Sequence, residues 1–255
     1  MNVKVMTYNI LYGGVQRESL LLQVIKSANP DVLILQEVAE HKTIHDFSSE
    51  LGMNLFIAEG GFSQHGIALL SRFPIVNPKS IHPFPPISRT LLSAAVEVSP
   101  KSQLQIYGVH LIPHPQFLLE LWRAWEVQTI LKQVVANNKD FYLIAGGLNA
   151  VAPGDNFSTH TMPRLLKLML WTQGGLVFRW AINRLIVFGF TDCYRLLHPD
   201  EDGFTLPPPS PTIRLDYIFV NAGLKERLVN CNVITSPSVV NQASDHYPIM
   251  AEFLL

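Results

Sequence analysis

Polar side chains stand at the ends of several short apolar runs in this sequence, where extended segments would deliver them to a common edge. The set consists of Asn9, Glu37, His110, Asn149, Asp216, Asp245 and His246. Carboxylate and amide oxygens are the ligands that a hard cation such as Mg²⁺ prefers, with near-octahedral geometry and room for water. A histidine beside them can act on a phosphate oxygen or on a proton. Any one of these residues alone is more often structural, so the prediction of such chemistry depends on the whole set and its order.

The apolar pattern predicts the elements that must position these side chains, because strand-like and helix-like segments alternate along the chain. Strands are expected at 3–10, 31–38, 66–72, 91–98, 104–111, 141–150, 214–221, 231–235 and 247–255, and helices at 17–28 and 115–138. No fixed-period repeat and no long linker divides the sequence, and the Pro-rich segment 206–211 is interpreted as a stiff loop. We therefore expect one mixed α/β domain over residues 1–255.

The overall composition limits the classes of partner. The 255 residues include 19 Lys and Arg against 20 Asp and Glu, so the net charge of -1 gives no global attraction to nucleic acid. The two cysteines, Cys193 and Cys231, are too few for a disulfide framework and lack metal-ligand spacing, so we expect them to be small buried residues. The N-terminal segment lacks the features of a signal peptide, and the expectation is a cytoplasmic protein.

One segment, residues 162–190, has an unusual composition. It is strongly apolar, and its charged residues are all basic: Arg164, Lys167, Arg179 and Arg184. Its longest uncharged run, 168–178, is well short of the roughly 20 residues that span a bilayer. The segment is predicted to form two short helices interrupted at Gly174 and Gly175. They either pack on the core or form a basic, apolar lid that contacts a membrane surface or an apolar substrate.

Short motifs in a fixed order carry a resemblance to a known family. They are TYNI (7–10), LQEV (35–38), GIALLSR (66–72), YGVHL (107–111), GGLN (146–149), RLDYIFV (214–220) and SDHYPI (244–249). This order resembles the endonuclease/exonuclease/phosphatase superfamily, which has the fold of deoxyribonuclease I and includes apurinic endonucleases, neutral sphingomyelinases and inositol polyphosphate 5-phosphatases. The resemblance implies a four-layer α/β/β/α sandwich of two packed mixed β-sheets flanked by helices, and Mg²⁺-dependent hydrolysis of a phosphate ester.

The resemblance also implies which residues hold the metal ion. Glu37 would be the principal ligand of Mg²⁺ or Mn²⁺, with Asn9 beside it. Asp245 would lie close to the same ion or to a second one, so the number of ions stays open.

Residues near the phosphate are implied in the same way. His110 and Asn149 would hold the scissile phosphate or its leaving oxygen. His246 would contact the phosphate, and Asp216 would orient the imidazole and fix its tautomer.

Weaker candidates for phosphate or substrate contacts are Tyr8, Arg72, Arg89 and Arg123. For any one of these arginines, a structural salt bridge is the simpler interpretation. Other histidines are expected to lie on the surface: His114 at the rim of the site, and His41 and His45 on a helix without a third ligand.

The sequence departs from the family pattern at Gly147. The family motif is Gly-Asp-Phe/Leu-Asn, whose aspartate orients or deprotonates the attacking water, and Gly147 stands in its place. Asp140 lies on the wrong side of the preceding strand, and Asp155 would reach back only by a loop rearrangement. Loss of general-base help costs roughly 10²- to 10⁴-fold in rate, so we expect a site that binds metal and phosphate but turns over slowly. Two origins of Gly147 stay open: a natural variant, or a substitution made to trap a bound state.

Loops determine the substrate in such folds, and several interpretations stay open. A small-molecule or lipid phosphodiesterase or phosphatase is favoured, because the net charge is near zero and residues 162–190 are apolar and basic. A DNA or RNA nuclease would need a local basic groove. A phosphate-binding pseudoenzyme is supported only by Gly147. The protein is expected to be a monomer.

Overall fold

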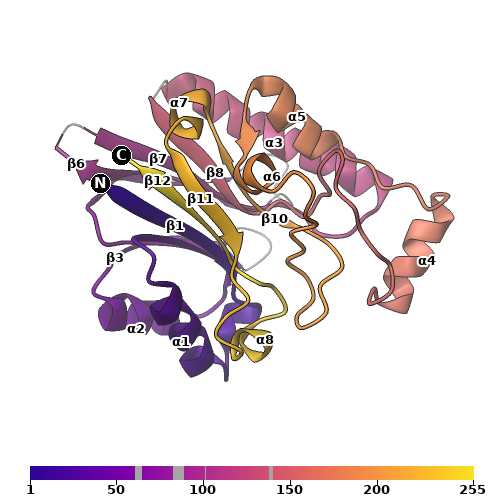
Figure 1. Ribbon diagram of the computed structural model, residues 1–255, viewed down its shortest axis with the longest axis horizontal. Coiled ribbons are helices and arrows are strands. Elements are labelled where there is room, and N and C mark those ends of the chain that lie inside the picture. Colours follow the sequence, from indigo (N-terminus) through magenta and orange to yellow (C-terminus); the bar gives the residue numbers. More distant parts are fainter. Residues whose placement is uncertain (61–64, 83–88, 101, 138–139) are drawn as a thin grey trace.

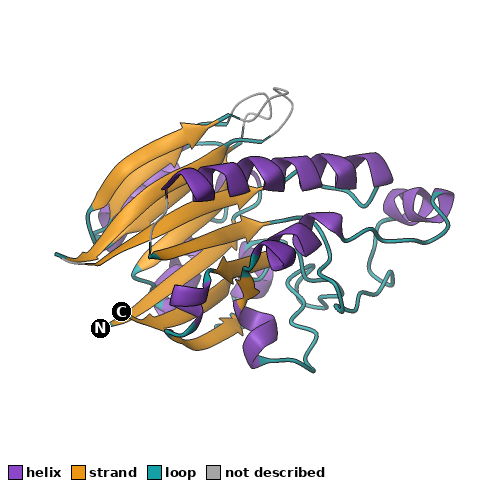
Figure 2. Ribbon diagram, turned by 90° about the horizontal axis from the view of Figure 1, so that it is seen from above, coloured by secondary structure: helices purple, strands orange, loops and turns teal. Residues whose placement is uncertain are grey.

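The computed structural model describes residues 1–60, 65–82, 89–100, 102–137 and 140–255, and it consists of two packed β-sheets with helices on their outer faces (Figures 1 and 2). The β1 sheet has the strand order β11 (Leu228–Val233), β12 (Ile249–Leu254), β1 (Asn2–Asn9), β2 (Val32–Val38), β4 (Gly66–Ser71), β3 (Asn54–Ala58). The β8 sheet has the order β5 (Ile75–Ile81), β6 (Leu91–Ser99), β7 (Ser102–His110), β8 (Phe141–Gly147), β10 (Asp216–Val220), β9 (Thr191–Asp192). Both sheets are mixed, because β1 pairs in parallel with β2 and β7 pairs in parallel with β8.

Alternation along the strands separates the apolar layers. Val5 of β1 packs against the other sheet, whereas its neighbour Met6 packs against helices on the outer face. That outer face is covered by α1 (Glu18–Ala28), α2 (His41–Leu51) and α8 (Val240–Ala243). The outer face of the β8 sheet is covered by α3 (Phe117–Asn137) and α5 (Trp180–Phe188). The expected four-layer α/β/β/α sandwich is confirmed.

The register of the strands brings the polar strand ends together. In the β1 sheet, Asn9 pairs with Gln36, so Asn9 lies beside the next residue, Glu37. In the β8 sheet, His110, Gly147 and Asp216 lie side by side on three adjacent strands. The site residues therefore meet at one end of the sandwich, because this register places their strand ends next to one another.

The segment 162–190 forms two short helices, as predicted. Helix α4 (Arg164–Thr172) and α5 are separated by a turn in which Gly174 and Gly175 both have positive φ angles. Figures 1 and 2 both place α4 at one end of the molecule, beyond the sheets and beside the start of α3. Among the described residues, no helix is long and apolar enough to cross a membrane.

Several smaller elements were not predicted. They are β3, β5, β9, the 3-10 turn η1 (Tyr12–Gly14), α6 (Cys193–Leu197), α7 (Ala222–Lys225) and α8. The sequence of β5 contains Pro78 and is mostly exposed, so it lacks the alternation that marks a half-buried strand. The predicted surface helix with exposed His41 and His45 is present as α2. Cys193 and Cys231 are buried free thiols, as expected.

Candidate active site

The strand ends open into one pocket of about 700 Å³. Its polar end is lined by Asn9, Glu37, Arg89, His110, Asn149, Asp245 and His246. Tyr12 and His65 also line this end, and their rings lie 5.5 Å apart. Asp216 lies directly behind His246 and is buried. The structure thus brings together every predicted metal ligand and every predicted catalytic position.

Glu37 reaches the pocket because the backbone is distorted at this residue. It has a φ of 62°, an uncommon value for a non-glycine residue, and the register with β4 shifts between Gln36 and Val38. Such an extra residue in a strand redirects a side chain, and bulges of this kind are frequent beside active sites. Two donors then hold the carboxylate: Asn9 Nδ2 at 3.0 Å from Oε1, and the backbone N–H of Tyr12 at 2.9 Å from Oε2.

The oxygen donors around Glu37 fit a hard divalent cation. Burial raises the pKa of Asp245; the nearby His246 opposes this change, and the negative charge of Glu37 adds to it. A cation between these two carboxylates would remove that unfavourable repulsion. Among the described residues, no group of three or more His, Cys, Asp or Glu side chains is arranged as a metal cluster. The carboxylates of Glu37 and Asp245 match Mg²⁺, which keeps several waters and needs only one or two carboxylates. Asn9 directs its Nδ2 to Glu37, and its Oδ1 accepts the backbone N–H of Leu11.

His246 forms a buried ion pair with Asp216. Its Nδ1 lies 2.7 Å from Asp216 Oδ2, and the hydroxyl of Thr205 donates to the same oxygen at 2.6 Å. Burial lowers the pKa of His246, but the charge of Asp216 and the hydrogen bond to it outweigh burial and raise the pKa to about 9. The ring is therefore cationic at neutral pH. Because Asp216 occupies Nδ1, Nε2 is left to donate to a ligand in the pocket.

His110 is neutral, in contrast to the cationic His246. Burial, together with the positive charges of Arg89 and His246, lowers the pKa of His110 well below its usual value. Arg89 Nη1 lies 2.6 Å from His110 Nδ1 and donates to it, so the neutral ring carries its proton on Nε2. That nitrogen lies 3.8 Å from Glu37 Oε1. His110 is thus a neutral donor beside the carboxylate.

Glu126 of α3 supports this arrangement and was not predicted. Its two carboxylate oxygens accept the backbone N–H groups of Arg89 and Ile112, both at 3.2 Å. Burial raises the pKa of Glu126 to about 7, and the hydrogen bonds and arginines around it oppose that change. In the sequence, Glu126 is only one carboxylate in a long helix, with no motif to distinguish it.

Asn149 follows β8 and is held in a left-handed conformation with a φ of 50°. Its Nδ2 donates to the carbonyl oxygen of Leu111 at 2.6 Å, and its backbone N–H donates to that of Leu215 at 3.3 Å. These bonds fix the amide at the pocket wall, beside the end of β7. Asn tolerates this backbone conformation better than most residues, which is consistent with its place here.

The other end of the same pocket is apolar. It is lined by side chains from the loop after β8, from α4 and from the turn that precedes α5. Examples are Val151, Phe157, Met162, Leu166 and Phe178. The pocket can therefore hold a ligand with an anionic group at one end and an apolar group at the other.

The sequence matches the Endonuclease/Exonuclease/phosphatase family over residues 6–246. The chain belongs to this family. Among its relatives, exodeoxyribonuclease III of Haemophilus influenzae is 25% identical over 283 aligned positions, which cover 98% of this chain and 100% of that protein.

Solved structures share the fold of this family member over its whole length. An AP endonuclease from Archaeoglobus fulgidus matches with a TM-score of 0.77 and 18% identity, covering 99% of this chain and 100% of that chain. The 3′ phosphatase NExo from Neisseria, bound to a product DNA hairpin, matches with a TM-score of 0.76 and 18% identity, with the same coverage. Truncated TDP2 from Caenorhabditis elegans matches with a TM-score of 0.69 and 17% identity, covering 100% of this chain and 98% of that chain.

The two adjacent glycines of this family member differ in what they allow. A Cβ on Gly146 would lie 1.8 Å from the carbonyl oxygen of Val109, and the φ of Gly146 is 143°, so only glycine fits. Gly147 has an ordinary φ, and its Cβ would lie 3.0 Å from His110 Cδ2 and 3.6 Å from Asp216 Oδ1. That buried oxygen of Asp216 has no hydrogen-bond partner in the described structure. A side chain at Gly147 would therefore point into the polar site.

Neither Asp155 nor Asp140 supplies a carboxylate beside Gly147. Asp155 is buried in an ion pair with Arg214, at 2.8 Å, and with Arg195, at 3.0 Å. The fully buried Arg214 also pairs with Asp192, so this network ties the loop after β8 to β9 and β10. Asp140 is exposed at the opposite end of β8. Both outcomes agree with the expectation from the sequence.

Three of the four residues predicted as weaker candidates for substrate contacts do not present an unbonded side chain to the pocket. Tyr8 is 1% exposed and packs among the outer helices, because it faces the opposite side of β1 from the site. Arg72 donates to the side chain of Asn29 and the carbonyl of Pro30, outside the pocket. Arg123 touches the pocket but is 2% exposed.

Arg123 is held by structural bonds. It pairs with Glu120 at 2.9 Å and donates to the carbonyls of Ile112 and His114. Of the four weaker candidates, only Arg89 directs its guanidinium at the site. His114 is exposed at the pocket rim, as expected.

Proposed function

We propose that this chain is a divalent-metal-dependent hydrolase of phosphate esters, in which water attacks phosphorus. The observation that carries the proposal is the convergence of two carboxylates, two amides, His110, His246 and Arg89 on the polar end of one pocket. The family and the names of its relatives, which include a nuclease and a DNA 3′ phosphatase, support this reaction class.

In this proposal, Glu37, Asn9 and Asp245 hold Mg²⁺ or Mn²⁺. When bound, the ion would supply Lewis-acid stabilisation of charge on the phosphate. The first test is metal titration of the unmodified chain by calorimetry. We expect Glu37→Gln to weaken binding roughly ten- to hundredfold. Equal affinity in the two proteins would remove Glu37 from the metal site.

The remaining polar residues hold the phosphate. The cationic His246 donates from Nε2, the neutral His110 donates from Nε2, and the Arg89 guanidinium adds positive charge beside His110. Preorganised donors of this kind stabilise the negative charge that develops in the transition state. Asn149 completes the group on the side where β8 ends.

Gly147 is the proposed defect of the site. We infer that an aspartate at this position would orient or deprotonate the attacking water, as the resemblance implies. Its absence leaves the binding groups intact and removes general-base help, which corresponds to roughly 10²- to 10⁴-fold in rate. The chain is therefore expected to bind metal and phosphate and to turn over slowly.

The favoured substrate is a phosphodiester or phosphomonoester with an apolar group, because the pocket continues from its polar end along an apolar wall. The experiment is a substrate screen of Gly147→Asp with Mg²⁺, using an aryl phosphodiester, an aryl phosphomonoester and supercoiled plasmid. Hydrolysis of an aryl ester without plasmid nicking at low salt would support this choice.

A nuclease is the second candidate, because the relatives named above include an exodeoxyribonuclease and an AP endonuclease. Plasmid nicking by Gly147→Asp at rates that match or exceed hydrolysis of the aryl esters would favour it. If the restored variant hydrolyses none of these substrates while it binds metal, the third interpretation, a phosphate-binding pseudoenzyme, is supported instead.

A further inference from the structure

We propose that the outer surface formed by α4, α5 and the first half of α3 docks on an anionic lipid surface. We call it the docking face. Its area of contact would lie beside the mouth of the active-site pocket, so the inference deepens the proposed function by naming a membrane as the place where substrate is met. Docking itself does not require that the proposed hydrolysis is correct.

The docking face exposes large apolar side chains to solvent over more than half of their surface. On α4, Leu165 is 63% exposed, Leu168 is 54% exposed and Trp171 is 75% exposed. Leu118 at the start of α3 is 71% exposed, and Leu176 between α4 and α5 is 60% exposed. A helix that presents leucine and tryptophan beside basic residues matches a helix lying in a membrane interface.

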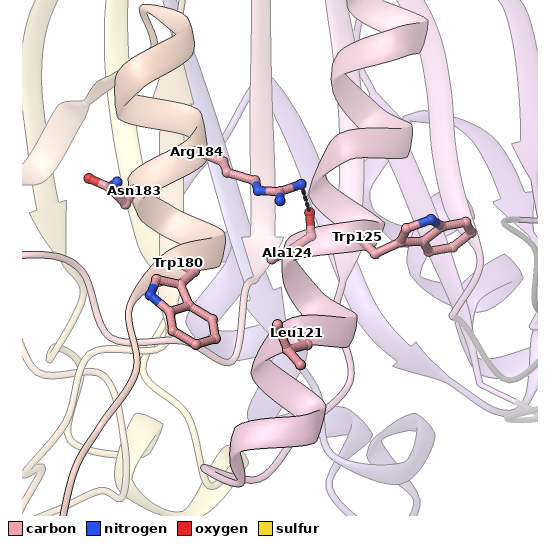
Figure 3. Close-up of a pocket in the computed structure, with 6 residues that line it drawn as sticks. All are labelled: Leu121, Ala124, Trp125, Trp180, Asn183 and Arg184. Carbon is pink, nitrogen blue, oxygen red and sulfur yellow. Dashed lines mark hydrogen bonds between the residues drawn. The ribbon is translucent and has the colours of Figure 1, made fainter.

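A shallow groove between α3 and α5 continues the docking face. It is lined by Leu121 and Trp125 of α3 and by Trp180 and Arg184 of α5 (Figure 3). Arg184 reaches across the groove and donates to the carbonyl of Ala124 at 3.0 Å. Tryptophan and arginine at one apolar groove are suited to the boundary between lipid head groups and acyl chains.

The charge of the docking face favours an anionic lipid surface. Residues 156–191 contain no Asp or Glu, whereas the chain as a whole has a net charge of -1. The carboxylates of α3 that lie nearest, Glu120 and Glu126, are both 0% exposed. Arg164, Lys167 and Arg184 are exposed. Basic residues at a membrane surface are attracted to anionic lipids, each by about tenfold or less in affinity.

The docking face is continuous with the active-site pocket. Phe178 lines the pocket, and its ring centroid lies 5.1 Å from that of Phe117 and 5.0 Å from that of Trp180, which lines the groove. Helix α4 also has two sides, because Leu166 lines the pocket while Leu165 faces solvent. A molecule leaving a lipid layer beside these helices would meet the apolar wall of the pocket first and its phosphate-binding end next.

Other partners fit this surface less well. Nucleic acid binding depends on a series of cations that neutralise phosphates, and here apolar side chains outnumber the basic ones. A second copy of the chain would bring two basic, carboxylate-free surfaces together if the faces met symmetrically. An anionic lipid layer can contact both the apolar and the basic side chains of the docking face.

The test is co-sedimentation of the full chain with phosphatidylcholine vesicles that contain or lack phosphatidylserine. One variant combines Leu165→Ser, Leu168→Ser and Trp171→Ser, and another combines Arg164→Glu and Lys167→Glu. Matched controls are Val229→Ser with Leu254→Ser, which are equally exposed on the β1 sheet, and Lys42→Glu with Lys79→Glu. All four variants change exposed positions, so unfolding midpoints are expected to match that of the unmodified chain.

We expect binding to phosphatidylserine vesicles that falls by about tenfold or more in both docking-face variants and stays unchanged in both controls. The charge variant should lose the preference for phosphatidylserine over phosphatidylcholine. No binding of the unmodified chain to either vesicle, or equal binding by all variants, would overturn the proposal. Two further results would overturn it: a dimer in light scattering that the apolar variant abolishes, or binding to a DNA duplex, without binding to lipid, that the apolar variant abolishes. Because no step requires hydrolysis, these outcomes are independent of those for the proposed reaction.

Discussion

At the scale of single residues, the site depends on two neighbouring glycines with different roles. Gly146 is fixed by the close approach of the Val109 carbonyl, whereas Gly147 has room for a side chain that would contact His110 and approach Asp216. The sequence alone suggested this difference through the motif. The structure gives its physical basis, because the two positions face different surroundings although they are adjacent in β8.

An added methyl group is expected to change the free energy of unfolding differently at these two glycines. Gly146→Ala is expected to lower the free energy of unfolding by more than about 3 kcal/mol, because the backbone must move to relieve the contact with Val109. Gly147→Ala is expected to change it by about 1 kcal/mol or less, since only the His110 ring must shift. Denaturant midpoints measure both. Similar losses in the two variants would contradict the assigned difference.

The positive charge of His246 depends on its buried partner Asp216. Asp216 contributes the largest of the effects that raise the pKa of His246, ahead of Asp245 and Glu37, so Asp216→Asn is expected to lower this pKa clearly below about 9. An NMR titration of the imidazole measures this shift directly. A pKa that stays near 9 would show that Asp216 does not hold the charge.

At the scale of elements, the site is built from strand ends and adjusted by features that no motif marks. The strands other than β3, β5 and β9, the helices α1 and α3, and the break between α4 and α5 follow from apolar periodicity and turn residues. The distorted backbone at Glu37, the support from Glu126 and the pairing of Arg214 with Asp155 do not. Each of these depends on which segments meet in three dimensions, and local sequence patterns carry no such information.

Glu126 links α3 to the two segments that carry Arg89 and Ile112, and it makes stability depend on pH. Its pKa is about 7 in the folded chain and near the ordinary 4.5 in the unfolded chain, so the folded state binds more protons between these values. Its stabilising contribution is complete below pH 4.5 and is lost as the pH rises through about 7. We expect Glu126→Gln to remove this part of the pH dependence.

Urea unfolding of both proteins at several pH values between 4.5 and 8 measures this contribution. We compare the free energy of unfolding of Glu126→Gln with that of the unmodified chain. The difference between the two should change from pH 4.5 to about 7 and stay constant at higher pH. A difference that is constant throughout would show that Glu126 does not titrate there.

At the scale of the whole molecule, one end of the sandwich combines the polar end of the pocket, an apolar pocket wall and an apolar, basic outer surface. The near-zero net charge suggested that the chain is not a general nucleic-acid binder, and the structure places its local basic residues beside exposed leucine and tryptophan. The family accounts for the pocket, and substrate choice rests on the loops and helices around it. The fold was therefore predictable from motifs, whereas the surroundings of the pocket required the structure.

The apolar wall of the pocket bears on the choice of substrate. Gly147→Asp is expected to hydrolyse an aryl phosphodiester at low salt without measurable nicking of supercoiled plasmid, because the pocket wall is apolar. Fluorescent ester assays and gel analysis under identical conditions test this. Rapid nicking that disappears at high salt would instead indicate an electrostatic nucleic-acid groove.

We infer that Gly147 stands where the site lacks a carboxylate. The most direct test compares hydrolysis of an aryl phosphodiester with saturating Mg²⁺ by the unmodified chain, Gly147→Asp and Gly147→Asn, which has a side chain of the same shape without a base. We predict that Gly147→Asp is at least about a hundredfold faster than both of the others, and that this gain is lost when the metal is removed. Equal rates for all three proteins with metal bound would contradict the claim.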